Sequence, residues 1–391
     1  MDYVFRGGTV LLHDRALPGH DLWIRGRTVV AVGPQGELPV PSDARVVDAT
    51  GLVVGPGFVD IHCHGGGDAW VHLDPVTATE AQLAHGTTSM LATTILHPTH
   101  AEQLQAVATI ADAIVAGQTR NVVGIHMEGP YLNPAYGAFR ELSRVALPEE
   151  YLDFAEAGRG RLRSMTIAPE VEGVEQMVYR LQAATGGAMF FSVGHSRATA
   201  EQIGRLVPAG LRVATHLLNA TGCAISPSRY EGTREVGVDE LVLLEDGIAA
   251  ELIADRSGRH VRPDLLKLVC KVKGLGGVIL VTDAAGAQSE APAGEENQLD
   301  VRFNASGGLA GSALTMDVAV GNMARHTGLS LVEVWRMGSY NPAASLGMLG
   351  AIGQLAPGRA ANIVLARVGD DQELTVEQVW LEGQLAIGEP R

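Results

Sequence analysis

The stretch "FVDIHCH" at residues 58–64 carries two histidines, one residue apart, at the end of an apolar run. His62 and His64 are separated by two positions, which is the period of a β-strand, so both side chains leave the same face and Cys63 points the other way. Three glycines follow and end the strand sharply. Two imidazoles at a strand end suit a metal ion, but the pair alone fits two polar residues without function equally well.

Further residues of the types that bind metals stand at the ends of other strand-like runs. With the runs that they end, they are Glu128 ("NVVGIHME"), His195 ("AMFFSVGH"), His216 ("LRVATH") and Asp283 ("GVILVTD"). A single histidine at a strand end is usually structural, whereas six such residues at the ends of five runs predict a metal centre. Imidazoles and carboxylates without thiolates favour Zn²⁺ or a similar divalent ion as the cofactor.

We expect these residues to hold two ions per chain, bridged by a carboxylate. The set divides into His62, His64, Glu128 and Asp283 for one ion, and Glu128, His195 and His216 for the other. Many binuclear barrel hydrolases use a carbamylated lysine as the bridge. Here the three lysines all lie in "LLKLVCKVK" at residues 265–273, outside the strand-like runs named above, so a glutamate must take that role.

The elements that position these residues alternate in type along the chain. Eight apolar runs predict strands, with helical stretches between them, at residues 58–64, 88–95, 121–128, 162–169, 188–195, 211–216, 247–254 and 277–283. This alternation predicts an α/β fold, a (β/α)₈ TIM barrel, whose chemistry lies at the carboxyl ends of the strands. A doubly wound open sheet is the alternative. It is disfavoured because no strand–GxGxxG–helix unit is present.

Composition limits the classes of function. The chain has 391 residues, 46% of them hydrophobic, and a net charge of −15 without a basic stripe, so we expect no nucleic-acid partner. No apolar run is long enough to span a bilayer, and "MDYVFRGG" is not a signal sequence, so we expect no membrane partner. Three scattered cysteines predict no disulfide framework. Together these features predict a cytoplasmic protein.

The ordered motifs resemble those of the amidohydrolase superfamily, and most of all its N-acetylglucosamine-6-phosphate deacetylases. They are "PGFVDIHCHG", "HMEGPYLNPAYGAF", "SVGHSRAT", "THLLNA", "LVTDAAGA", "LAGSALTMDVAV" and "NPAASLGM…GQLAPGRAANIVLA". The resemblance implies a barrel at residues 56–349 and a small β-sandwich domain formed by residues 1–55 and 350–391, which are rich in short β-like runs. It also implies a homodimer that hydrolyses the N-acetyl amide of a small sugar phosphate.

The resemblance assigns roles to individual residues. Asp283 would take a proton from the attacking water and deliver it to the leaving amine, because an amide nitrogen leaves poorly until it is protonated. The backbone amides of Asn219 and Ala220 would meet a phosphate. Arg234, in "EGTREVG", would bind that phosphate from the neighbouring subunit, and His260 would contact the sugar.

Three departures from the family pattern all concern substrate recognition. The family's "GAH" is "GAF" here, so Phe139 replaces a hydrogen-bonding histidine. The spacing before His260 is longer by two residues, which adds Arg256 and Arg259, and "NAM" has become "NAT". N-acetylglucosamine 6-phosphate is therefore the first expectation for the substrate. N-acetylgalactosamine 6-phosphate and an N-acyl-D-amino acid stay open, and a non-catalytic scaffold is disfavoured by the intact ligand set.

Overall fold

The computed structural model describes residues 1–221, 232, 236–287 and 300–390. Its centre is a sheet of eight parallel strands that are neighbours in chain order. Each of these strands overlaps one of the eight predicted runs. The strands are β8 (Phe58–Cys63), β11 (Thr87–Thr94), β12 (Val122–Glu128), β13 (Leu162–Ile167), β14 (Phe190–Val193), β15 (Leu211–Ala214), β16 (Ala249–Leu252) and β17 (Val278–Leu280).

Hydrogen bonds just beyond the first and last of these strands bring their ends together. The main-chain N–H of Asp283 donates to the carbonyl of His62 at 2.9 Å, and that of His64 donates to Ala284 at 2.7 Å. The Thr282 hydroxyl also donates to the buried Asp60 carboxylate at 2.6 Å. The predicted (β/α)₈ barrel is confirmed, and the open doubly wound sheet is wrong, because the strand order follows the chain without a switch point.

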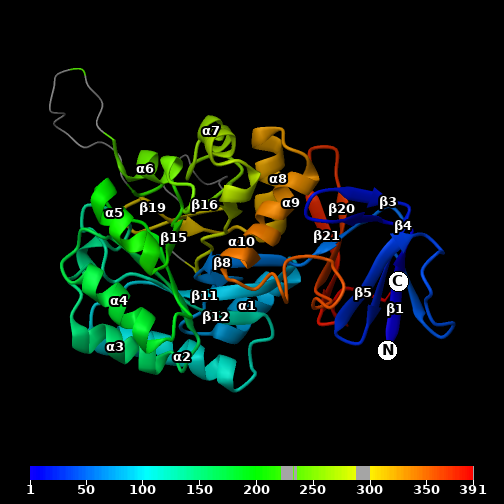
Figure 1. The fold of residues 1–391 in the computed structure, drawn as a ribbon, viewed down its shortest axis with the longest axis horizontal. Helices are drawn as coiled ribbons and strands as arrows, with labels where there is room; N and C mark the ends of the chain where they lie inside the picture. Colours follow the sequence, from blue (N-terminus) through cyan, green and yellow to red (C-terminus); the bar gives the residue numbers. More distant parts are fainter. Residues whose placement is uncertain (222–231, 233–235, 288–299, 391) are drawn as a thin grey trace.

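Helices surround the barrel (Figure 1). They are α1 (Pro75–Ala84), α2 (His100–Val115), α3 (Pro148–Ala157), α4 (Val174–Ala184), α5 (Ala200–Leu206), α6 (Val238–Leu244), α7 (Pro263–Lys273), α8 (Met316–Thr327), α9 (Leu331–Met337) and α10 (Tyr340–Ser345), with short 3₁₀ helices η1 (Arg140–Leu142), η2 (Val207–Ala209) and η3 (Leu275–Gly277). The longest, α2, begins with a capping box between Thr99 and Glu102. It buries Ala106, Val107 and Ile110, whose spacing forms one helical face.

The two ends of the chain form two further sheets beside the barrel (Figure 1). One has the order β5 (Thr28–Pro34), β4 (His20–Arg25), β1 (Asp2–Arg6), β6 (Arg45–Asp48). The other has the order β22 (Gln384–Ile387), β21 (Leu374–Leu381), β20 (Ile363–Val368), β7 (Val53–Pro56), β2 (Thr9–Leu11), β3 (Ala16–Pro18). One apolar cluster joins them through residues such as Phe5, Leu22 and Trp380. The domain boundaries at 55/56 and 349/350 stay a prediction.

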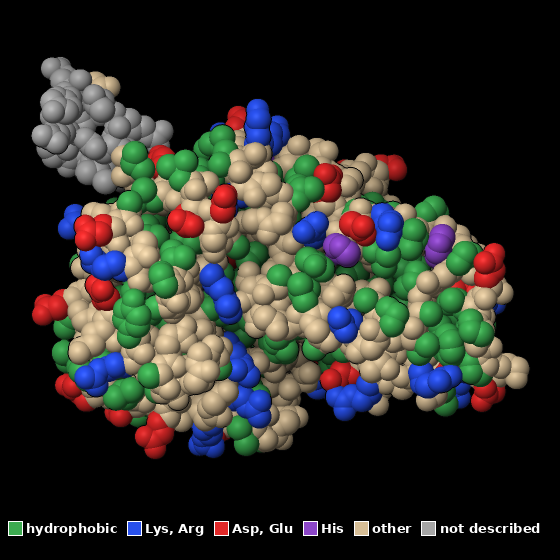
Figure 2. Space-filling model, in the orientation of Figure 1, with side chains coloured by type: hydrophobic (Ala, Val, Ile, Leu, Met, Phe, Trp, Pro, Cys, Tyr) green, Lys and Arg blue, Asp and Glu red, His purple; other side chains and the backbone are tan. Residues whose placement is uncertain are grey.

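Two short hairpins lie near the carboxyl ends of the barrel strands. They are β9 (Gly65–Gly66) with β10 (Ala69–Trp70), and β18 (Val301–Phe303) with β19 (Leu309–Ser312). Positive and negative side chains intermix over the face shown in Figure 2. Within the described ranges, no helix has the length and apolarity needed to cross a membrane.

Candidate active site

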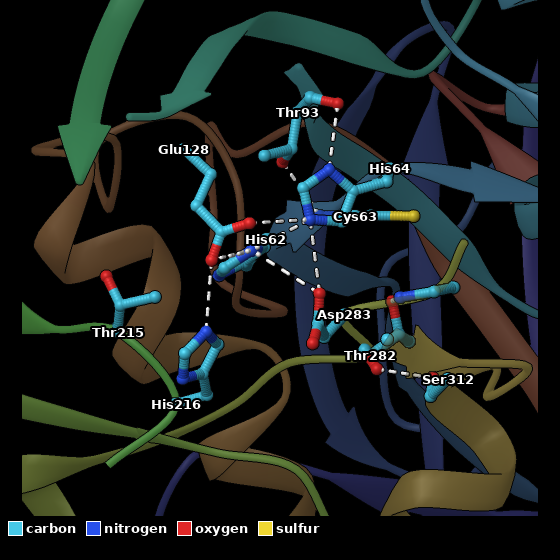
Figure 3. A network of polar contacts seen from close by, with 12 residues as sticks. His62, Cys63, His64, Thr93, Glu128, Thr215, His216, Thr282, Asp283 and Ser312 are labelled. Atoms are coloured by element: carbon cyan, nitrogen blue, oxygen red, sulfur yellow. Dashed lines mark hydrogen bonds and ion pairs between the residues drawn. The ribbon is translucent and has the colours of Figure 1, made fainter. Parts of the chain in front are cut away.

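All six predicted ligands converge at the carboxyl end of the barrel. They form two clusters, within each of which the ligand atoms lie within 4.8 Å of one another. We call His62, His64 and Asp283 the first cluster, and Glu128, His195 and His216 the second. Figure 3 shows His62, His64, Glu128, Asp283 and His216 pointing toward one centre. Residues from the ends of five barrel strands that lie far apart in the sequence are thus neighbours, as the barrel prediction requires.

Glu128 lies between the two clusters. Its Oε1 is 2.9 Å from Nε2 of His195 and 3.0 Å from Nε2 of His216. Its Oε2 is 3.2 Å from Nε2 of His64, which Asp283 Oδ1 also approaches to 3.2 Å. A carboxylate with one oxygen toward each cluster occupies the position that a bridging ligand needs. The assignment of ligands to individual ions stays a prediction.

Three histidine rings are oriented so that one nitrogen of each ring faces the centre. In these rings Nδ1 faces an oxygen acceptor: Glu251 Oε2 at 3.2 Å from His62, Thr93 O at 3.2 Å from His64, and Asn219 O at 3.0 Å from His216. With Nδ1 as the donor in these contacts, Nε2 is the nitrogen of each ring that can bind an ion at the centre. His195 differs, because its buried Nδ1 has no hydrogen-bond partner among the described residues. The backbone of Gly137 packs against that ring, and a Cβ there would stand 3.0 Å from Nδ1.

The electrostatics of the centre favour cations. Burial of Glu128 favours its neutral form, but the His62 charge and hydrogen bonds from His195 and His216 hold its pKa well below the usual value. Burial likewise opposes a charge on His64, yet the Asp283 and Glu128 carboxylates raise its pKa to about 9. Two ionised carboxylates therefore lie in a buried site and need compensating positive charge.

Three of the six side chains are carried by a strained backbone. His195, His216 and Asp283 have φ values of +47°, +27° and +49°, in the left-handed region that residues other than glycine rarely adopt. Each lies two or three residues after the end of a barrel strand. Strain of this kind persists where the surrounding structure enforces it, and it concentrates at functional sites. The strand ends thus turn these three side chains inward.

The donor set fits a divalent metal ion. Four imidazoles and two carboxylates, all of them buried, direct ligand atoms at one centre. In three of the imidazoles the second ring nitrogen already faces an oxygen acceptor. Cys63 is not part of this set. Its thiol is buried, donates to the carbonyl of Gly65 at 3.1 Å, and has a raised pKa because of burial. Cys63 points away from the centre in Figure 3, as the strand period predicts.

A cavity of about 610 Å³ opens over the two clusters. Phe139, Asn219 and Ala220 line it, so the structure brings these three predicted substrate residues next to the candidate ligands. The backbone N–H of Asn219 donates to the carbonyl of His216 at 3.0 Å, so a turn already uses this amide. Ala220 has a φ of +48°. Arg234 lies outside the described residues.

His260 lies behind the cavity wall rather than in it. Its Nδ1 is 3.1 Å from the Asp255 carboxylate, and its Nε2 is 3.1 Å from the carbonyl of Gly311, which lines the cavity. The two additional residues before it belong to a turn around Asp255, which also accepts the N–H groups of Ser257 and Arg259. Despite burial, these hydrogen bonds lower the pKa of Asp255 to about 2. The structure therefore holds both His260 nitrogens in contacts within the protein.

Two residues at the site were not predicted from the sequence. Glu251 contacts a candidate ligand from β16, and its signal was a lone charge within the apolar run "GIAAELIA". Arg140 is the one lysine or arginine among the described residues that line the cavity, and it is exposed. Its neighbour Phe139 was recognised only through the family pattern. No pattern in the sequence distinguishes Arg140 from a surface arginine.

Fold and site together define a class of barrel proteins with a divalent-metal centre at the strand ends. The model of the Amidohydrolase family matches residues 53–386. The chain therefore belongs to the amidohydrolase family.

Relatives with assigned names narrow the comparison. N-acetylgalactosamine-6-phosphate deacetylase of Escherichia coli O157:H7 is 32% identical over 409 residues, covering 99% of this chain and 100% of that protein. N-acetylglucosamine-6-phosphate deacetylase of Lysinibacillus sphaericus is 31% identical and covers 87% of each chain. A mutant N-acetyl-D-glucosamine-6-phosphate deacetylase of Mycobacterium smegmatis, solved in complex with N-acetyl-D-glucosamine-6-phosphate, superposes with a TM-score of 0.81 at 30% identity, covering 98% of each chain.

Proposed function

We propose that this protein is a metal-dependent deacetylase of N-acetylhexosamine 6-phosphates, with N-acetylglucosamine 6-phosphate as its principal substrate and glucosamine 6-phosphate and acetate as products. The observation that carries the proposal is the pair of ligand clusters joined by Glu128 at the base of an open cavity. The relatives of nearly full length that are named as deacetylases support the substrate class.

The residues around the centre have distinct tasks in amide hydrolysis. The two clusters would hold a divalent ion, which would supply Lewis-acid charge to polarise the amide carbonyl and to acidify water. Asp283 faces the cavity with its Oδ1 3.2 Å from His64, so its carboxylate can accept a proton from the attacking water. As the carbon–nitrogen bond breaks, Asp283 returns that proton to the amine nitrogen. Acetate and a free amine result, and Asp283 is ionised again.

The cavity wall supplies recognition of the sugar and its phosphate. In our proposal Arg234 binds the phosphate from a neighbouring subunit. Asn219 and Ala220 contact the same phosphate from the turn after β15. His260 either supports the cavity wall or contacts the sugar after a rearrangement. Arg140 is a second candidate for the anion, because this residue lines the cavity in the same chain. Phe139 presents a ring where a polar contact would favour the sugar hydroxyls.

Two epimers compete for the role of substrate. N-acetylgalactosamine 6-phosphate is the second candidate, because a relative named for that substrate matches this chain over 99% of its length. The N-acyl-D-amino acid alternative becomes the leading one only if phosphate makes no difference to turnover. A non-catalytic scaffold conflicts with the converging ligand set.

An acetate-release screen tests the proposal. Both N-acetylhexosamines are assayed with and without the 6-phosphate, together with N-acetyl-D-amino acids. We expect the highest kcat/KM for N-acetylglucosamine 6-phosphate. Equal rates with and without phosphate would remove the sugar-phosphate assignment, and absence of acetate release from every compound in the presence of metal would remove the deacetylase assignment.

We further propose that Zn²⁺ is the native ion, with two per chain, that the protein is a cytoplasmic homodimer, and that residues 1–55 and 350–391 form one small domain. The imidazole-rich donor set supports zinc. Elemental analysis and light scattering test the ion and the dimer.

A further inference from the structure

Glu251 is a buried carboxylate that contacts residues of both clusters. It lies on β16 with 1% of its surface exposed. Its Oε2 is 3.2 Å from Nδ1 of His62 and accepts the main-chain N–H of His216 at 3.3 Å. The same residue's carbonyl accepts the N–H of Leu217 at 2.8 Å. One side chain thus touches a first-cluster ring and the backbone that carries a second-cluster ring.

The presence of a carboxylate here needs an explanation other than packing. Its strand neighbours Ala250 and Leu252 are apolar, and within the described ranges no lysine or arginine pairs with Glu251. Burying a carboxylate without such a partner costs several kcal/mol, typically more than an apolar residue of similar volume would. The polar contacts in the structure that offset this cost are those to His62 and His216.

The two clusters depend on Glu251 to different degrees. The ring of His62 is held at Nδ1 by this carboxylate, whereas the rings of His64 and His216 are held by backbone carbonyls. A carboxylate fixes the tautomer and also makes the opposite nitrogen a stronger ligand than a carbonyl does. For His216, Glu251 contacts only the main chain, and Asn219 O orients the ring.

We propose that Glu251 is a positioning residue that fixes His62 as a ligand of the first cluster and thereby sets the affinity of that cluster for its ion. The second cluster keeps its ion when Glu251 loses its charge. The inference rests on the proposed function only in requiring that the site binds metal; it does not depend on the substrate.

The test is Glu251→Gln in the full-length protein, stripped with a chelator and titrated with Zn²⁺ in buffers of defined free concentration. We expect one of the two binding steps to lose about 10- to 100-fold in affinity and the other to stay within error. The wild type loaded with Mn²⁺ should give the electron paramagnetic resonance spectrum of a coupled pair of ions. The variant at limiting Mn²⁺ should give the spectrum of an isolated ion.

Asp317→Asn is the matched control. Asp317 is also a buried carboxylate that contacts a histidine, with Oδ2 3.0 Å from Nδ1 of His85, but this pair lies outside both clusters. Its loss should lower thermal stability and leave both metal affinities unchanged. Glu251→Met, which removes the acceptor oxygens at similar length, replaces Glu251→Gln if that variant does not fold.

The outcomes separate this inference from the proposed function. A wild type that binds no divalent ion removes the proposed function and the inference together. A wild type with two ions and a Glu251 variant with the same two affinities overturns only the inference. Equal weakening of both steps also overturns it, because Glu251 would then support the barrel as a whole.

Discussion

The metal centre and the wall of the cavity are built in different ways. Every candidate ligand stands at or just after a barrel strand and is buried, with its side chain held by its neighbours. The wall includes Phe139 and Arg140 from the segment after β12, and Leu309 from a short hairpin. Strand ends therefore fix the chemistry, while loops that tolerate change fix the substrate. One of the departures from the family pattern, Phe139, lies on the wall, which is where a change of substrate is easiest.

Metal removal should have the largest effect and should act on the centre alone. Chelated protein should lose acetate release down to background, and added Zn²⁺ should restore it. Because an ion that binds only the folded state stabilises it, metal at 100 times its Kd should add about 2.7 kcal/mol to the free energy of unfolding. Calorimetry of stripped and loaded protein measures this. Full activity in protein without measurable metal would contradict the assigned centre.

The substitution Asp283→Asn should have the second-largest effect on activity. The amide keeps the shape of the side chain but cannot carry the proton, so turnover should fall by about 10²-fold or more while most of the metal is kept. Steady-state kinetics with elemental analysis of the same sample checks this. Near-normal turnover would mean that another group moves the proton.

Substitution of the arginines acts on the wall alone. Loss of one charge-assisted contact to phosphate costs about 1.5–3 kcal/mol, roughly a 10- to 150-fold decrease in kcat/KM. Arg140→Ala and Arg234→Ala should each be compared with wild type on phosphorylated and dephosphorylated substrate. The decrease should appear only with the phosphorylated one.

The control for these variants is Arg180→Ala, an exposed arginine on α4 outside the cavity lining, which should change neither rate. If neither Arg140→Ala nor Arg234→Ala alters the preference for phosphate, these arginines do not bind it. The N-acyl-D-amino acid alternative would then lead.

Phe139→His should have the smallest effect. A restored hydrogen bond to a sugar hydroxyl is worth about 0.5–1.5 kcal/mol, so kcat/KM for N-acetylglucosamine 6-phosphate should rise about 2- to 10-fold. Phe139→Leu, which restores no donor, should give no rise. An unchanged or lower value for the histidine variant would show that this segment recognises a different group.

The sequence was sufficient for the barrel and the convergence of ligands, because both follow from short-range periodicity and a strong rule about strand ends. It was insufficient where a contact depends on packing across the barrel. Glu251 meets His62 from a strand 189 positions away, and no local pattern specifies that pairing. The contacts of His260 depend on a turn around Asp255 that the longer spacing creates. Arg140 enters the cavity through the course of a loop, which side-chain type does not determine.

The contacts between Asp283 and His62 also indicate at which stage of folding the metal centre can form. Because His62 ends the first barrel strand and Asp283 follows the last, the first cluster cannot assemble until the ribosome has delivered strand eight and the barrel has closed. The second cluster draws only on strands three, five and six and can assemble earlier. Occupancy of the first cluster therefore requires that the barrel has closed.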